Sequence, residues 1–280
     1  MVTNTFPVNE ARLLIENPKD IPQIGFLGGE EGKEINDSIK ADYKDFKALQ
    51  VGSYSGDVVR GSNPFYAVAV QSEIPLGVRV ATQADLEKAL KTGMDLSGTY
   101  EDTGLVLRSG DNPNKYLARN LIAQVKGRLG KKAKMPVMIP LYGMELVKDQ
   151  DSPHGLAFKL KEDAEIVYSP ILNKQGNFNS EDVDEKTGLP KRTGEGNRTL
   201  YTTNSGLSGL CLGDGLGLGS VSVDLTDSGG SGRVVLVSTA EGGSQDFLNG
   251  KLAKLQTERD LQLAKINERY KRAEAVLRGK

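Results

Sequence analysis

A short glycine-rich stretch near the N-terminus, "GGEEGKE" at 28–34, has the Gly-Lys pair of a phosphate-binding loop. In that motif a glycine stands five residues before the pair and Ser or Thr follows it, so that backbone amides and a hydroxyl reach phosphate and magnesium. Here Leu27 and Glu34 occupy those two positions. The stretch is therefore not predicted to bind a nucleoside triphosphate.

A second glycine run, "GDGLGLG", begins like a dinucleotide fingerprint with Gly213 and Gly215, but Leu218 stands at the third glycine position. The run is followed by "SVSVDL", which is typical of a strand and not of the helix that this fingerprint opens. The acidic segment "NFNSEDVDE" has the oxygen ligands of a calcium loop, yet Asp182 stands where that loop requires glycine. These stretches predict no metal site and no cofactor.

The remaining reactive side chains do not form a catalytic set. One cysteine, Cys211, and one histidine, His154, exclude a disulfide framework and a structural zinc site, which needs about four ligands. His154 lies in a Pro-Gly turn without an identifiable nucleophile, which favours an exposed or locally bonded side chain. Glu162, Asp163 and Glu165 keep an enzyme hypothesis open, but the solvated side of a strand and turn explains them more simply. We expect no enzyme.

Charge and hydropathy narrow the classes of partner. The 280 residues carry a net charge of −1, so the chain lacks the basic excess of a nucleic-acid-binding protein. No apolar run reaches the roughly 18 residues of a membrane span, and the N-terminus lacks the basic and apolar parts of a signal peptide. These features predict a soluble chain without a membrane span, cytoplasmic or virion-associated, and disfavour nucleic acid as a partner.

Local patterns predict irregular structure followed by strands in the first part of the chain. Residues 1–60 show no sustained period and are expected to be extended or irregular. "FYAVAV" at 65–70 and "GVRVAT" at 77–82 are short, β-branched and bounded by Pro and Gly. Such runs predict strands.

Two helices are marked by their start signals. Thr82, with Asp85 three residues later, predicts the cap of a helix that ends near "KTG". The second helix is expected to have Asp111 or Asn112 as its cap and Pro113 at its first position, because proline is favoured there. Apolar residues at helical spacing follow in "NKYLARNLIAQVKG".

The later part of the chain alternates strands with loops. After Pro136, strand-like pieces are separated by the turn signal "DQDSPHG". The polar, glycine-rich residues 173–199 predict a long surface loop. Residues 246–279 have apolar side chains at three-and-four spacing and predict an amphipathic helix, through which the chain is expected to form a homo-oligomer.

The segment 207–232 combines small residues with regularly spaced leucines. Two pairs of leucines are two residues apart, which puts each pair on one face of an extended chain. We name the leucines expected to be buried the leucine frame: Leu210, Leu212, Leu216, Leu218 and Leu225. "RVVLV" at 233–237 is expected to be the central strand against which the segment pairs.

The residues between the leucines are unusual for strands. Glycine gives up backbone entropy and offers no side chain to pack, so strand stability does not explain the glycines that alternate with the leucines. The segment also contains no Lys, Arg, Glu, Gln, Met, Trp or Pro, although Lys, Arg and Glu are frequent elsewhere in the chain. A constraint other than stability is therefore expected to have selected these residues.

Fixed hydrophobic residues interleaved with Gly, Asp, Ser, Val, Thr and Cys, and closed by a Gly-Arg-Val-Val strand, resemble the variable region of proteins diversified by retroelements. In that family, mutagenesis of adenines in Asn-type codons yields a restricted set that includes these residues and excludes Lys, Glu, Gln, Met and Trp. The resemblance covers about residues 198–237. Two features depart from the family: the chain continues beyond the segment, and fixed aromatic residues are absent from it.

This resemblance implies an α+β fold with a C-type lectin-like domain, in which variable side chains on a fixed backbone bind a protein or cell-surface ligand. The implied organisation is an N-terminal extension (1–60), the lectin-like domain (61–240) with its variable region at about 207–232, and a linker with the C-terminal amphipathic helix (241–280).

The predicted ligand-binding residues, which we name the slots, share small size and a place between the leucines. They are Cys211, Gly213, Asp214, Gly215, Gly217, Gly219, Val221, Ser222, Val223, Asp224, Thr226, Asp227, Gly229, Gly230 and Ser231. Because Tyr, Trp and Arg are absent from the slots, weak binding is predicted.

Two other hypotheses stay open. The segment is compatible with an ordinary glycine-rich hairpin of a structural protein. The other hypothesis is a phage or virion assembly protein that oligomerises through its C-terminal helix. It is compatible with the binding hypothesis, because a displayed binding module gains avidity in an oligomer.

Overall fold

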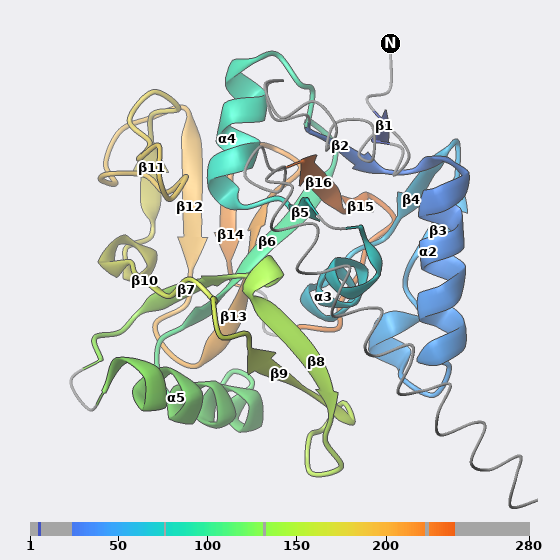
Figure 1. The fold of residues 1–280 in the computed structure, drawn as a ribbon. Helices are drawn as coiled ribbons and strands as arrows, with labels where there is room; N and C mark the ends of the chain where they lie inside the picture. Colours follow the sequence, from blue (N-terminus) through green and yellow to red (C-terminus); the bar gives the residue numbers. More distant parts are fainter. Residues whose placement is uncertain (1–4, 7–23, 76, 131–132, 222–223, 239–280) are drawn as a thin grey trace, which may run out of the picture.

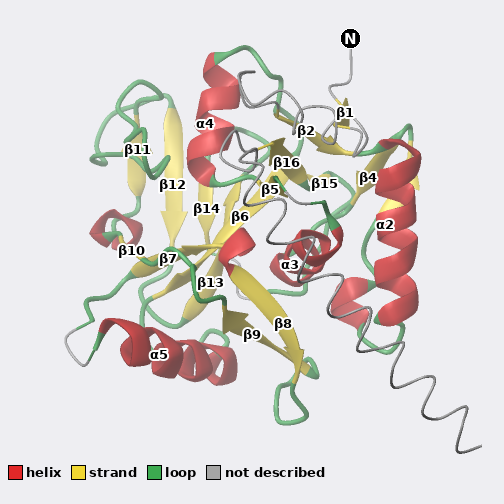
Figure 2. Cartoon of the chain, in the orientation of Figure 1, coloured by secondary structure: helices red, strands yellow, loops and turns green. Residues whose placement is uncertain are grey.

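The computed structural model describes residues 5–6, 24–75, 77–130, 133–221 and 224–238. Over these ranges the chain is a mixed α/β protein with two larger β-sheets, two hairpins and helices around them (Figures 1 and 2). The predicted mixture of helices and strands is confirmed at this level. The helix predicted at 246–279 lies outside the described residues.

The smaller sheet brings together strands from near the two ends of the described chain. Its strands, in spatial order, are β1 (Thr5–Phe6), β2 (Ile24–Leu27), β16 (Val235–Ser238) and β5 (Val78–Val80). β1 runs parallel to β2, and β16 runs antiparallel to both β2 and β5. The strand predicted at 77–82 is confirmed as β5.

The larger sheet contains most of the segment 207–232. Its spatial order is β10 (Val167–Tyr168), β7 (Val137–Pro140), β6 (Tyr100–Leu107), β13 (Leu207–Leu212), β14 (Leu218–Ser220), β12 (Arg198–Thr202) and β11 (Gly176–Phe178). The short β15 (Gly232–Arg233) runs parallel to β6. β6 contributes Leu105 and Leu107 to one hydrophobic cluster and Val106 to another, so the sheet separates two cores.

Hairpins and helices cover these sheets. The hairpins are β3 (Ser53–Ser55) with β4 (Val58–Arg60), and β8 (Met144–Lys148) with β9 (Leu156–Leu160). The α-helices are α2 (Gly29–Asp42), α3 (Pro64–Glu73), α4 (Gln83–Lys91) and α5 (Lys115–Leu129), and short 3-10 turns are η1 (Lys47–Leu49), η2 (Leu141–Gly143) and η3 (Pro170–Asn173). No helix among the residues described is long and apolar enough to cross a bilayer.

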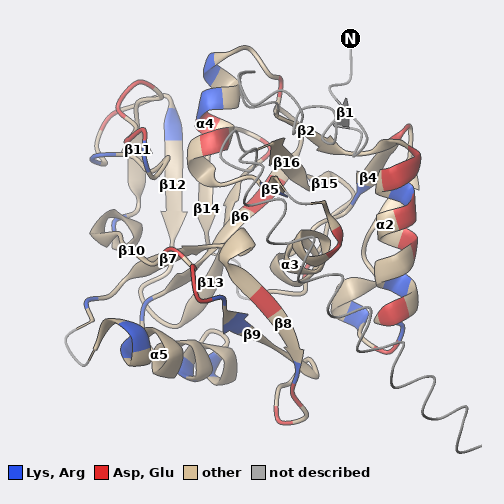
Figure 3. Ribbon diagram, in the orientation of Figure 1, with Lys and Arg blue, Asp and Glu red and all other residues tan. Residues whose placement is uncertain are grey.

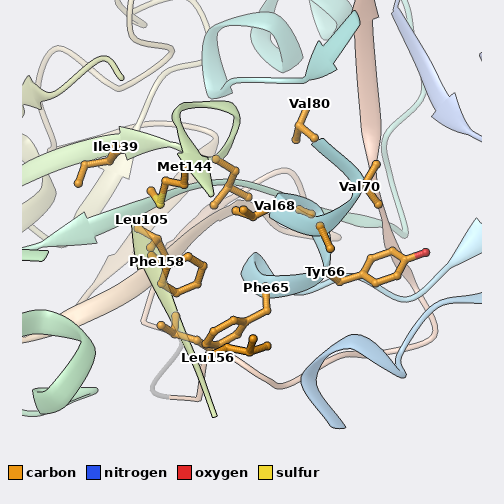
Figure 4. Close-up of a cluster of buried hydrophobic side chains, with 14 of the residues drawn as sticks. Phe65, Tyr66, Val68, Val70, Val80, Leu105, Ile139, Met144, Leu156 and Phe158 are labelled. Atoms are coloured by element: carbon orange, nitrogen blue, oxygen red, sulfur yellow. The ribbon is translucent and has the colours of Figure 1, made fainter. Parts of the chain in front are cut away.

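Helix α3 shows that the strand predicted at 65–70 is wrong. Asn63 caps the helix, because its Oδ1 accepts a hydrogen bond from Tyr66 N at 2.8 Å, and Pro64 occupies the first turn. Every side chain from Phe65 to Val70 is buried, so the run has no polar face and no helical period in the sequence. Figure 4 shows Phe65 against Phe158 of β9, with ring centroids 4.5 Å apart.

Of the two predicted helix starts, that of α4 is confirmed and that of α5 is wrong. The cap of α4 is confirmed, since Thr82 and Asp85 form the reciprocal bonds of a capping box. Helix α5 begins at Lys115, later than predicted. The carbonyl of Pro113 accepts from Leu207 N at 3.0 Å, and Asn114 Nδ2 donates to Leu207 O at 2.8 Å, so these residues bind β13 in place of opening the helix.

The prediction of irregular structure is wrong for residues 24–60, which form β2, α2 and the β3–β4 hairpin. Helix α2 buries only Gly32, Asn36 and Ile39, so a single large apolar side chain marks its inner face and no period is visible. Tyr66 holds the helix to the core, because its hydroxyl donates to Asn36 Oδ1 at 2.8 Å.

The polar residues 173–199 are only partly the surface loop that was predicted. β11 lies inside this range and β12 begins at its end. Phe178, Val183 and Leu189 are buried in the second core. Because these apolar residues are widely spaced, the sequence gives no period that would indicate packing.

Candidate functional site

The leucine frame is largely confirmed as a buried scaffold. Leu210, Leu212, Leu218 and Leu225 have no exposed surface. The first three belong to the second core, whereas Leu225 packs into the first core. Leu216 differs, because it is half-buried and lies in the turn between β13 and β14 with φ of 62°.

That turn is fixed by a buried ion pair. Gly213 N donates to Gly217 O at 2.7 Å, which closes the turn. Arg198 Nε donates to Leu216 O at 2.5 Å, and the guanidinium of Arg198 pairs with both carboxylate oxygens of Glu87 in α4 at 2.7 Å. Arg198 also lies over the ring of Phe178 at 4.8 Å. The exposed turn is therefore held from below by a bidentate charge pair.

A second buried cation holds the strands on the same side. The guanidinium of Arg108, the residue after β6, donates to the hydroxyls of Ser208 and Ser220 at 2.9 and 2.8 Å, and to Thr202 Oγ1 at 2.6 Å. These three acceptors lie on β13, β14 and β12. Burial lowers the pKa of Arg108 to about 10, so the side chain remains a cation at neutral pH. Arg108 thus locks three neighbouring strands in register.

The chain from 224 to 232 is fastened at several points. Asn63 Nδ2 donates to Thr226 O at 3.0 Å. The Tyr100 hydroxyl accepts from Gly229 N at 2.7 Å and donates to Ser62 O at 2.8 Å. The side chains of Asn63 and Tyr100 therefore hold backbone groups of this segment and leave most of its side chains unused.

The side of β12, β13 and β14 away from the second core is named here the open face. In register across it lie Tyr201, Gly219, Cys211 and, on β6, Asp102. A Cβ added at Gly219 would lie 3.0 Å from Cys211 Sγ, and one added at Gly217 would lie 3.7 Å from Tyr201 Cε2, so these positions share one side. Figure 3 shows charged residues on α2, α4 and α5 but none on β13 or β14.

Cys211, Gly217 and Gly219 lie on the open face, whereas the other described slots lie in the turn between β13 and β14 and in the connection from β14 to β15. Asp214, Gly215, Val221, Asp224, Asp227, Gly229 and Gly230 are exposed, and Cys211, Gly213, Gly217, Gly219, Thr226 and Ser231 are half-buried. Ser222 and Val223 lie outside the described residues. Burial raises the pKa of the Cys211 thiol to about 12, so it is protonated at neutral pH.

The glycines of the segment form two classes. A Cβ added at Gly215 or Gly230 would meet no heavy atom within 4 Å, and one added at Gly213 or Gly229 would come no closer than 3.4 Å to any. None of the slot glycines has φ in the left-handed region. At Gly217 and Gly219 the nearest atoms would be 3.0 Å away, so a side chain there needs a small adjustment.

Gly206 and Gly232, which are not slots and which we name the frame glycines, behave differently. Gly206 has φ of 69°, and an added Cβ would lie 2.4 Å from Pro113 N. At Gly232 the added atom would lie 2.6 Å from the Tyr100 ring and 2.7 Å from Ser62 N. Glycine is therefore required at these two positions by backbone conformation or close contact, whereas the four roomy slots do not require it.

Two carboxyl groups beside the slots were not predicted from the sequence. Burial raises the pKa of Glu101 to about 8, although Thr99 Oγ1 donates to it at 2.5 Å. Burial also raises the pKa of Asp102 to about 6, opposed by a 2.6 Å bond from Ser62 Oγ. No sequence signal marks these acids, because their burial comes from the β6–β13 and β6–β15 pairing.

No cluster of His, Cys, Asp or Glu suited to a metal ion occurs in the described ranges. His154 is half-buried and packs edge-on against Phe65 with ring centroids 5.4 Å apart. Glu162 and Asp163 are exposed, and Glu165 accepts a 3.3 Å bond from Tyr142.

The strand predicted at 233–237 is divided between two sheets. β15 pairs with β6, and β16 pairs with β2 and β5, so "RVVLV" is not the central partner of the segment. β6 and β12 take that place, next to β13 and β14.

No known family model, curated protein or solved structure matches this chain.

Proposed function

We propose that this chain is a non-enzymatic ligand- or receptor-binding protein, in which exposed slot side chains on a fixed backbone set specificity. The observation that carries the proposal is the contrast between the two classes of glycine. Gly213, Gly215, Gly229 and Gly230 lie in turns and connections, have room for a side chain and have no left-handed φ. Alanine at such positions is favoured by about 0.4–1 kcal/mol, because it restricts the unfolded chain more than glycine does. A surface that accepts many residues at these positions explains why glycine occurs there without being needed.

The finer form of the proposal is a C-type lectin-like domain diversified by a retroelement. It is supported by the residue types in the slots, all of which belong to the set that mutagenesis of adenine-containing codons produces. The gene offers a direct test. We expect a nearby near-repeat of the segment with adenines at the slot codons, together with a reverse transcriptase gene. Related sequences that vary as much at the leucines as at the slots would contradict diversification.

Binding is tested with two forms of the chain. One is the natural chain, and the other carries Asp214→Ser, Val221→Ser, Asp224→Ser and Asp227→Ser at exposed slots. Each is immobilised and used to select from the same random-peptide phage library. We expect both forms to unfold at similar temperatures and to select different peptides. A control form carries Lys88→Ser and Lys126→Ser, which are exposed on α4 and α5.

The control form should select the same peptides as the natural chain. If the natural and slot-substituted forms recover the same peptides with the same affinity, the slots do not set specificity and the proposal fails.

A further inference from the structure

Tyr201 stands beside the slots although it lies outside segment 207–232. It is on β12, and its register partner on β14 is Gly219. The ring edge reaches to 3.7 Å from the point where a Cβ of Gly217 would be. The aromatic side chain missing from the segment is therefore supplied to the open face by the neighbouring strand.

The fold leaves about half of Tyr201 exposed to solvent. Tyr201 is 49% exposed, whereas its chain neighbour Leu200 is fully buried on the opposite side of the strand. The Tyr201 hydroxyl makes no hydrogen bond to any residue in the described ranges. A large, rigid ring with a free hydroxyl has the properties of an interface anchor, because it offers contact area at low entropic cost.

The turn beside Tyr201 carries an acidic side chain. Asp214 is exposed in the turn whose Gly217 lies next to the Tyr201 ring, and its charge reaches Cys211, which is in the same row as Tyr201. Residues 199–231 contain no Lys or Arg. An aromatic face and a carboxylate together complement a cationic side chain, which is attracted to the ring quadrupole and to the negative charge.

We propose that Tyr201 is a constant contact residue of the binding surface, and that in this copy it acts with Asp214 to select a protein segment bearing Lys or Arg. This inference rests on the proposed function and adds the chemistry of the partner. Tyr201 would contribute to every version of the surface, because it is not part of the segment that varies. The charge preference would belong to this version alone.

The test uses peptides selected on the natural chain from a random-peptide phage library. We expect the selected peptides to be enriched in Lys or Arg. Tyr201→Ala should weaken their binding about tenfold or more, since exposed aromatic anchors dominate interfaces. Tyr201→Phe should keep affinity within about threefold, because the ring provides the contact area and the cation–π attraction.

A matched control is available on the same sheet. Tyr168 of β10 is also 49% exposed but lies at the opposite end of the strand order. Tyr168→Ala should leave binding unchanged. Asp214→Asn should weaken binding and reduce its dependence on salt.

Each failure has a distinct meaning. If slot substitutions abolish binding and Tyr201→Ala does not, Tyr201 is not an anchor and the proposed function still holds. If neither change alters binding, the proposed function fails as well. Recovery of no peptides, or of peptides without Lys or Arg enrichment, overturns the assignment of a cationic partner. Thermal unfolding of each variant shows that a loss of binding is not a loss of folding.

Discussion

The two sides of β12, β13 and β14 are built from the same strands and have opposite physical properties. On the buried side, Leu200, Leu212 and Leu218 are fully enclosed, and Arg108 and Arg198 donate hydrogen bonds to Ser208 Oγ and Leu216 O. On the open face, Tyr201, Cys211 and Gly219 lie in one row, in which Tyr201 is half exposed and Cys211 and Gly219 are half-buried. The buried side supplies most of the polar anchors of these three strands, so the open face has more room to differ in sequence.

The contrast between the buried side and the open face is tested most strongly by the Arg198–Glu87 ion pair beneath the turn. Arg198→Met should lower the free energy of unfolding by about 3–5 kcal/mol, because it leaves Glu87 buried without its charge partner. Chemical denaturation gives this value directly. The double variant Arg198→Met with Glu87→Leu should recover much of the loss. A loss below about 1 kcal/mol, the range of exposed pairs, would show that the turn does not depend on this anchor.

The next largest effect is expected at a frame glycine. Gly232→Ala should cost about 1–3 kcal/mol, as overpacking does, because its Cβ would lie 2.6 Å from the Tyr100 ring and 2.7 Å from Ser62 N. Gly230→Ala, two residues away, is the matched control and should not destabilise the protein. Equal losses at the two positions would remove the distinction between frame and slot glycines.

Glu101 and Asp102, two neighbouring acids on β6, make the free energy of unfolding depend on pH. The folded-state pKa of Glu101 is raised by burial to about 8, above the ordinary value of 4.5. Between these values the unfolded chain loses its proton while the folded chain keeps it, so stability falls as pH rises. Above about pH 6, where Asp102 has also ionised in the folded chain, the slope from Glu101 is at most about 1.4 kcal/mol per pH unit.

Denaturation of the natural chain and of Glu101→Gln at pH 6 and pH 7.5 measures this effect. The variant should show a flatter dependence, because the neutral amide has no proton to lose. Identical pH dependence in the two proteins would mean that Glu101 titrates at its ordinary pKa and is not desolvated by the pairing of β6 with β13 and β15.

The sequence was sufficient for the parts of the molecule that depend on local spacing. The period of two predicted the burial of Leu210, Leu212 and Leu218, and the capping residues predicted the start of α4. Contacts between distant segments leave no such pattern. The partners of Arg198 come from α4 and from the turn, and Tyr201 reaches the slots only because β12 pairs with β14.

The elements that were predicted wrongly have a related cause. Periodicity reports a boundary between buried and exposed sides, and α3 has no exposed side from 65 to 70. Helix α2 gives too little signal for the opposite reason, because only one large apolar residue, Ile39, marks its buried side. The segment "RVVLV" is rich in β-branched residues, which indicates a strand but cannot indicate which sheet receives it.

The smallest expected effect distinguishes slot glycines that can be replaced by a larger residue from glycines that are only exposed. Gly215→Ala and Gly230→Ala should leave stability unchanged or raise it by about 0.4–1 kcal/mol, because alanine restricts the unfolded chain more than glycine does. This requires a native backbone that alanine can adopt, and neither glycine has φ in the left-handed region or an atom within 4 Å of an added Cβ. Thermal and chemical denaturation of each single variant, and of the pair, provides the measurement. A loss of more than about 0.5 kcal/mol, the usual limit for surface changes, would mean that these glycines serve the fold and that these slots are no freer to vary than the buried side.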